Sequence, residues 1–142
     1  MSVDVKYRTK ATATGGREGH SATEDGAVDV KLVTPKELGV GGGDGVNPEQ
    51  LFATGYAACF LGALKAVAGK DKIKVPADAT VQAEVGIGPR SDGEGFGLEV
   101  ALTVTLPGIE ADVADDLMAR AHVVCPYSHA TRNNIKVDLK RG

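Results

Sequence analysis

The residues best suited to chemistry in this chain of 142 are its two cysteines, Cys59 and Cys125. Cys59 lies inside an apolar helical pattern, and Cys125 closes a second one. A thiolate acts as a nucleophile or a metal ligand, whereas a buried neutral thiol behaves as a small hydrophobic side chain. The pair therefore leaves three alternatives open: a redox couple, a metal site or two inert core thiols.

A metal site would use His122, Cys125 and His129, which are spaced i, i+3 and i+7, with Cys59 as a possible fourth ligand. Pro126 breaks the helical register between Cys125 and His129, and the chain has no Cys-x-x-Cys element. We therefore expect no metal ion. For each cysteine taken alone, an inert place in the core is the stronger alternative.

A reactive thiol needs a positive charge nearby, because a free thiol with a pKa of about 8.5 is mostly protonated at neutral pH. Residues 47–64 contain no Lys or Arg, and Cys59 lies too deep in the helix for the helix dipole to act strongly. Arg17, which follows a Gly-Gly turn, is the best candidate, and Glu49 could orient it through a bidentate pair. The alternative is that Arg17 is an ordinary solvated side chain.

The bulk properties fit a single domain over residues 1–142. The net charge of −3 gives no basis for nucleic-acid binding. The first thirty residues are polar, and no stretch approaches the roughly 18 apolar residues of a membrane span. We expect a cytoplasmic protein without a membrane segment, where paired cysteines are more often functional than structural.

The sequence pattern predicts an α+β fold, with mainly antiparallel sheets packed on two long helices. Asn47 as N-cap, Pro48 and Gln50 predict the start of a helix that runs to about Ala68, capped by Gly69. A second helix is expected over 110–124, where Pro126 ends it or restarts it at an angle. Alternation predicts strands over 3–14, 27–34, 80–88, 97–106 and 135–139.

Two long segments surround the cysteines: Asn-Pro-Glu-Gln-Leu-Phe-Ala-Thr-Gly-Tyr-Ala-Ala-Cys-Phe over 47–60 and Val-Cys-Pro-Tyr-Ser-His-Ala-Thr-Arg over 124–132. They resemble the two cysteine motifs of the organic hydroperoxide resistance (Ohr) proteins, a subfamily of the OsmC/Ohr peroxidases. The resemblance extends to 11–17 and 35–39 and covers essentially the whole chain. His129 and Asn133 depart from the family pattern, which has Asn and Gly there.

The resemblance implies a thiol peroxidase in which Cys59 attacks the peroxide and becomes a sulfenic acid, and Cys125 resolves it as a disulfide. It implies that Arg17, held by Glu49, stabilises the thiolate. It also implies an intertwined homodimer without a bound cofactor, reduced by the dihydrolipoyl group of a lipoylated partner protein. The alternative from another class is a non-catalytic redox sensor or binding module switched by the same thiols.

Four of the six aromatic residues fall within the two cysteine motifs: Phe52, Tyr56, Phe60 and Tyr127. They would supply an apolar surface beside the thiol that favours an alkyl or fatty-acid hydroperoxide over hydrogen peroxide. The alternative is that they form ordinary helix core, and they can serve both purposes.

Glu49 and Cys59 are ten residues apart, which corresponds to about 15 Å along an unbroken helix. One arginine serving both residues would be stretched. We therefore expect either a break in the helix near Gly55 or a site shared across a subunit boundary.

Overall fold

The computed structural model describes residues 1–39 and 41–142, and its contacts divide the chain into two units, Met1–Leu51 and Phe52–Gly142. Both units are built from strands and helices, so the predicted α+β class is confirmed. The single domain over residues 1–142 stays a prediction.

The first unit contains a small antiparallel sheet in the order β1-β2-β3. Gly15 and Gly16, with φ of 72° and 60°, turn the chain after β1 into a short 3-10 helix, η1, and another, η2, follows the sheet. Within 1–39 and 41–51, Leu32 alone is buried. The elements are β1 (Ala11–Thr14), η1 (Gly16–Glu18), β2 (His20–Thr23), β3 (Asp29–Lys31) and η2 (Lys36–Leu38).

Two strand predictions in this unit need correction. The expected strand over 3–14 is ordered as a strand only at Ala11–Thr14, and the one over 27–34 is reduced to Asp29–Lys31. The strand β2 was not predicted, because its side chains are mostly polar and show no alternation of apolar and polar residues. It forms through backbone pairing with the strands on both sides. Ala22, for example, pairs with Thr12 on β1 and with Asp29 on β3.

The second unit contains a sheet in the order β4-β5-β6. The antiparallel hairpin of β4 (Thr80–Pro89) and β5 (Phe96–Thr105) matches the predicted pair of strands to within a residue. The last strand, β6 (Val137–Arg141), starts two residues later than expected and runs parallel to β5. Alternate side chains of β5 are buried, which places one face of this sheet in the core.

The long helix α1 (Pro48–Lys70) starts at the predicted capping box. The Gln50 N–H donates to Asn47 Oδ1 at 2.8 Å, and the Asn47 N–H donates to Gln50 Oε1 at 2.9 Å. The helix is continuous through Gly55, so the expected break there is wrong, and the shared site stays a prediction. Gly69 is helical rather than the cap, and the left-handed residue after the helix is Lys72, with φ of 57°.

Cys125 joins the helices α2 (Ala111–Val124) and α3 (Pro126–Thr131), as the C-cap of one and the N-cap of the other. Its backbone is extended, with φ −64° and ψ 125°, because the residue before a proline avoids the helical region. Pro126 then starts α3 at its first position, where no N–H is needed. Pro126 therefore restarts the helix, which is one of the two outcomes that the sequence predicted.

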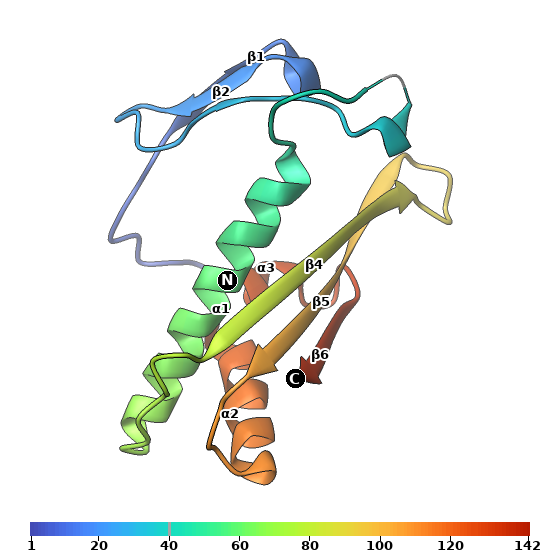
Figure 1. Cartoon of the computed structure of the whole chain (residues 1–142). Coiled ribbons are helices and arrows are strands. Elements are labelled where there is room, and N and C mark those ends of the chain that lie inside the picture. Colours follow the sequence, from blue (N-terminus) through green and yellow to red (C-terminus); the bar gives the residue numbers. More distant parts are fainter. Residues whose placement is uncertain (40) are drawn as a thin grey trace. The chain divides into compact units, whose positions relative to one another are not determined.

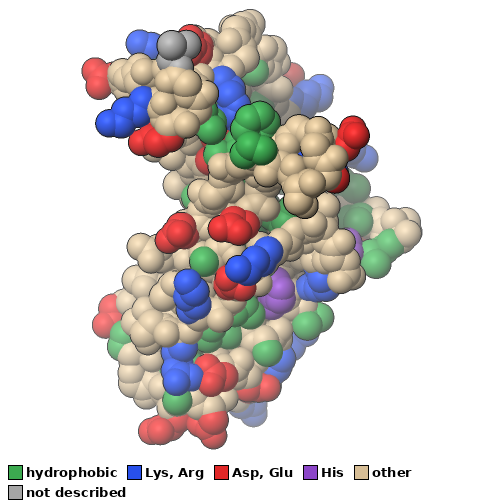
Figure 2. Space-filling view, turned by 90° about the vertical axis from the view of Figure 1, so that its right-hand side faces the viewer, with side chains coloured by type: hydrophobic (Ala, Val, Ile, Leu, Met, Phe, Trp, Pro, Cys, Tyr) green, Lys and Arg blue, Asp and Glu red, His purple; other side chains and the backbone are tan. Residues whose placement is uncertain are grey.

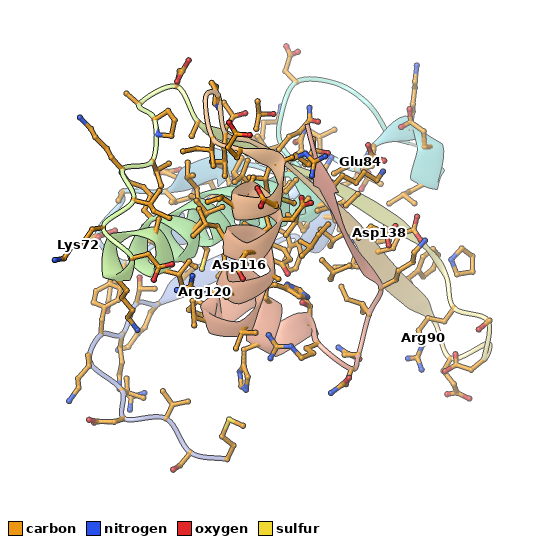
Figure 3. All side chains as sticks on the ribbon, turned by 90° about the horizontal axis from the view of Figure 1, so that it is seen from below. Lys72, Glu84, Arg90, Asp116, Arg120 and Asp138 are labelled. Carbon is orange, nitrogen blue, oxygen red and sulfur yellow. The ribbon has the colours of Figure 1, made fainter. Side chains whose placement is uncertain are left out.

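In the second unit, α1 and α2 pack on the same sheet (Figure 1). On the surface of α2, Arg120 and Asp116 lie side by side (Figure 3), and Arg120 also bonds to Asp71 in the turn after α1. The core is made of buried apolar side chains from α1, β5, α2 and the residues that directly follow β5 and α2: Tyr56, Phe60, Leu64, Val67, Ala68, Val100, Leu102, Val104, Leu106, Ala114, Leu117, Met118, Ala121 and Cys125.

The helix α1 is, by length and composition alone, able to cross a membrane, with a mean hydropathy of 1.5 over its most apolar window. The prediction that no stretch approaches a span is therefore wrong on that measure. A core helix meets the same test, so the measure alone does not establish a membrane span.

Candidate functional site

The two thiols meet where α1 passes the junction of α2 and α3. Cys125 is buried, Cys59 is partly buried, and both are free thiols. Their Sγ atoms are 3.7 Å apart. A disulfide needs about 2.0 Å between the sulfurs, so the two Sγ atoms must still move closer for one to form. The structure thus brings together two residues that are 66 positions apart in the sequence.

The surroundings of Cys59 within this unit favour the protonated thiol. Burial raises the pKa of Cys59, the backbone N–H of Tyr127 opposes that shift, and the neighbouring Cys125 adds to it. A raised pKa leaves less thiolate at neutral pH. Taken together, the immediate neighbours of Cys59 thus do not stabilise its thiolate. If Cys59 is to act as a nucleophile, a positively charged side chain from another part of the protein has to lower its pKa.

Arg17 and Glu49 form the bidentate pair expected from the sequence. The Arg17 guanidinium donates from Nη1 to Glu49 Oε2 at 2.9 Å and from Nη2 to Oε1 at 2.6 Å. The hydrogen bonds from Arg17 lower the pKa of Glu49, and the same bonds raise the pKa of Arg17. Both residues belong to the first unit, Arg17 in η1 and Glu49 in the first turn of α1, whereas the cysteines belong to the second.

The four predicted pocket aromatics divide into two groups. Tyr56 and Phe60 are fully buried, while Phe52 is half-buried and Tyr127 is 38% exposed. The rings of Phe52, Tyr56 and Tyr127 lie 5.7–6.0 Å apart between centroids, in a three-ring cluster. The core alternative thus holds for Tyr56 and Phe60, and contact of any of the four with a substrate stays a prediction.

A buried hydroxyl network that the sequence did not predict lies beside Cys125. Tyr56 Oη is 2.9 Å from Ser128 Oγ and 3.2 Å from Thr131 Oγ, and Ser128 Oγ is 2.8 Å from His122 Nδ1. Ser128 and Thr131 are buried. The available signal was their i, i+3 spacing on the segment after Pro126, which places two hydroxyls on one side of a helix.

The predicted alternative ligands of a metal are engaged differently. His122 faces the Ser128 hydroxyl and packs its ring against Phe60. Within residues 1–39 and 41–142, no group of three or more His, Cys, Asp or Glu side chains is arranged to hold a metal ion.

A groove of about 1060 Å³ lies in the second unit. It runs along the ends of β4 and β5 and the segment 130–136, and it includes Phe52 but neither cysteine. Its size alone is no reason to place the chemistry there, because the nucleophilic side chains lie elsewhere.

Known proteins match this chain in sequence and in fold. The OsmC-like protein family model matches residues 41–140. An organic hydroperoxide resistance protein of Xanthomonas axonopodis pv. citri is 55% identical, over 95% of this chain and 94% of that protein. A solved organic hydroperoxide resistance protein of Legionella pneumophila matches with a TM-score of 0.91 and 45% identity, over 98% of this chain and 99% of that one.

A second solved relative, the organic hydroperoxide resistance protein OhrB of Bacillus subtilis, matches with a TM-score of 0.87 and 41% identity. The match covers 97% of this chain and 100% of that one. In each comparison, the match therefore extends over nearly the full length of this chain and of the matched protein. The chain belongs to the OsmC-like family and, within it, to the organic hydroperoxide resistance proteins.

Proposed function

We propose that this protein is a thiol peroxidase that reduces organic hydroperoxides, such as alkyl and fatty-acid hydroperoxides, to alcohols. The observation that carries the proposal is the approach of Cys59 and Cys125, with 3.7 Å between their Sγ atoms, in a chain whose relatives are named for organic hydroperoxide resistance. A pair of free thiols at this distance suits a couple that cycles between dithiol and disulfide.

In the first step, the Cys59 thiolate attacks the terminal oxygen of the hydroperoxide. The O–O bond breaks, the alkoxide takes up a proton and leaves as the alcohol, and Cys59 becomes a sulfenic acid. The Cys125 thiol then attacks the Cys59 sulfur, forming the disulfide and releasing water. A dihydrolipoyl group on a partner protein restores both thiols by exchange and leaves as the lipoyl disulfide.

Arg17 is the cation proposed to shift Cys59 toward the thiolate, with Glu49 as the group that orients it. This proposal is supported by two facts: burial raises the pKa of Cys59, and residues 47–64 contain neither Lys nor Arg. A guanidinium fixed by two hydrogen bonds is already oriented and loses little entropy when an anion forms beside it. The same charge would offset the negative charge on the departing alkoxide.

A cytoplasmic homodimer is part of the proposal. One side of α1 carries small or apolar residues that are exposed in the single chain, namely Leu51, Ala58, Gly62 and Ala66. Such a surface allows a second copy to approach closely.

Acidic and basic side chains are interspersed on the face in Figure 2, with no patch of one sign there that would suit a nucleic acid.

The deciding experiment is steady-state reduction of cumene hydroperoxide with dihydrolipoamide as reductant. Cys59→Ser should lower turnover at least about 10³-fold, because the nucleophile is removed. Cys125→Ser should retain one round of alcohol formation and lose most of the turnover. Full turnover in Cys59→Ser would refute the mechanism.

The same assay separates the enzyme from the alternative, a non-catalytic redox sensor or binding module. A sensor would be oxidised once per chain and would produce no more alcohol than there are protein thiol pairs. A peroxidase produces alcohol in large excess over protein while reductant remains. Thioredoxin and glutathione in place of dihydrolipoamide test the identity of the electron donor.

A further inference from the structure

We propose that Ser128, joined to Tyr56 and His122 by a one-directional chain of hydrogen bonds, is a positioning residue that holds Cys125 within reach of Cys59. Its effect is on the second chemical step, the capture of the oxidised Cys59. The role in capturing oxidised Cys59 rests on the proposed peroxidase function. The placement of Cys125 by Ser128 rests on the hydrogen bonds described above.

The direction of the hydrogen bonds follows from counting protons. The three hydroxyls of Tyr56, Ser128 and Thr131 supply one proton each. Four hydrogen bonds nevertheless join the group, since Thr131 Oγ also bonds the backbone oxygen of Ser128 at 3.2 Å. The fourth proton must therefore come from the imidazole of His122, whose Nδ1 carries a hydrogen.

The chain of donors then has a single order. His122 Nδ1–H donates to Ser128 Oγ, and the Ser128 hydroxyl donates to Tyr56 Oη. The Tyr56 hydroxyl donates to Thr131 Oγ, and the Thr131 hydroxyl donates to the Ser128 carbonyl. If His122 instead carried its proton on Nε2, one of these buried bonds would be lost. Burial and the nearby Arg132 lower the pKa of His122, which agrees with a neutral ring.

The network matters for Cys125 because of the length of α3. Pro126–Thr131 is a helix of six residues, and so short a helix is not stable by itself in water. Ser128 lies three residues after Cys125 and ties α3 to α1 through Tyr56 and to α2 through His122. The Cys125 thiol, at the N-cap of α3, is thus placed from both sides.

A second tie supports the same placement. The Arg132 guanidinium, just after α3, donates to the backbone oxygens of His122 and Val123 at the end of α2. These bonds fix the two helices relative to each other across Cys125. Ser128 is the member of the network that contacts both Tyr56 and His122, so its hydroxyl is the point at which to break it.

The test is a pair of rates in Ser128→Ala. The rate of alcohol formation in a single turnover should stay within about twofold of wild type, while the rate of disulfide formation should fall about tenfold. At high cumene hydroperoxide, intact mass should show correspondingly more Cys59 sulfinic acid. Unchanged disulfide formation would overturn the proposal.

A matched control separates positioning from loss of stability. Val104→Ala removes buried side chain from β5, away from α3, and should destabilise the fold without changing the ratio of disulfide to sulfinic acid. If Val104→Ala changes that ratio as much as Ser128→Ala, the effect is one of stability and the proposal fails.

The proton order has its own readout in the reduced protein. The ¹⁵N spectrum of His122 should show a protonated Nδ1 and an unprotonated Nε2, and Ser128→Ala should shift it toward a mixture of tautomers. His122→Asn, which retains an N–H near the Nδ1 position, should keep disulfide formation closer to wild type than His122→Leu. A wild-type ring protonated on Nε2 alone would overturn the directional chain.

An assay without peroxide keeps this inference apart from the proposed function. With 5,5′-dithiobis(2-nitrobenzoate), Cys59 forms a mixed disulfide, and attack by Cys125 releases a second thionitrobenzoate. That second release should slow about tenfold in Ser128→Ala. If wild type does not reduce the hydroperoxide but the second release is slower in Ser128→Ala than in wild type, the peroxidase proposal fails and the positioning role stands. Equal release rates in the two proteins refute the positioning role.

Discussion

The Arg17–Glu49 pair and the Cys59–Cys125 pair are held by opposite means. The ion pair lies in a unit in which Leu32 alone is buried among the described residues, and two hydrogen bonds fix it. The thiol pair lies in a packed core, where helix ends, aromatic rings and a hydroxyl network fix it. Electrostatics therefore dominates one pair, and packing dominates the other.

For the proposed thiol peroxidase, the difference explains why neither pair would be sufficient alone. A core places two sulfurs accurately, but its low polarity disfavours the thiolate, as the raised pKa of Cys59 shows. An exposed helical turn such as η1 carries a charge at little desolvation cost, and the two hydrogen bonds to Glu49 orient that charge. If the two pairs act together as proposed, separate regions supply the charge and place the sulfurs.

The largest effect that would test this division is expected from Arg17→Ala. If Arg17 supplies the charge, the pKa of Cys59 rises further and the thiolate fraction at pH 7 falls roughly 30-fold. The rate of iodoacetamide alkylation against pH measures the pKa, and single-turnover alcohol formation measures the consequence.

Two further variants control this experiment. Glu49→Gln keeps the guanidinium but loosens its orientation, so a loss of only a few-fold is expected. Arg8→Ala removes an exposed arginine of the same unit and should leave the alkylation profile in place. An unchanged Cys59 profile in Arg17→Ala would show that the two regions do not share the work as described.

A smaller effect is expected from packing, at Gly55. A Cβ at this position would lie 3.0 Å from Tyr127 Oη and 3.2 Å from Cε2, so the ring must move by a few tenths of an ångström. Gly55→Ala should therefore lose the roughly 1 kcal/mol that alanine otherwise adds to a helix, and it should slow disulfide formation a few-fold. Urea unfolding and disulfide formation measure the two quantities.

Gly69→Ala is the matched control on the same helix, because nothing lies within 4 Å of the added Cβ. It should raise the free energy of unfolding by up to about 1 kcal/mol. In a Tyr127→Ala background, Gly55→Ala should behave like Gly69→Ala, since the clashing ring is gone. Equal effects of the two alanines in the wild-type background would contradict the packing account.

In both regions, the sequence predicts elements that local signals specify and misses pairings that leave no local pattern. The start of α1 and the β4–β5 hairpin were predicted because capping residues and alternation are local signals. The strand β2 was missed because its pairing is made by backbone groups and leaves no apolar pattern. The Tyr56–Ser128 contact was missed because it joins residues 72 positions apart, which no local pattern records.

The site shows the same division. Residue types and spacing identified the thiols and the Arg17–Glu49 pair as candidates, and the resemblance of the motifs implied their roles. The structure contains the 3.7 Å sulfur contact and the bidentate pair. The continuity of α1 through Gly55 could not be predicted, because a glycine costs a helix only about 1 kcal/mol and tertiary packing decides the outcome.

The smallest effect concerns the pH dependence of the packed region. Burial first, and then Arg132, lower the pKa of His122 in the folded chain below its unfolded value of about 6.5. Between these two values the unfolded chain binds more protons, so stability is complete above about pH 6.5 and is lost as the pH falls through the folded pKa. Thermal midpoints at pH 7.5 and 5.5 should differ by a few degrees, and His122→Asn should reduce the difference. If His122→Asn retains the full difference in thermal midpoint, protonation of His122 does not limit stability in acid. Protonation of the paired carboxylates, first of all Glu49, is then the better explanation.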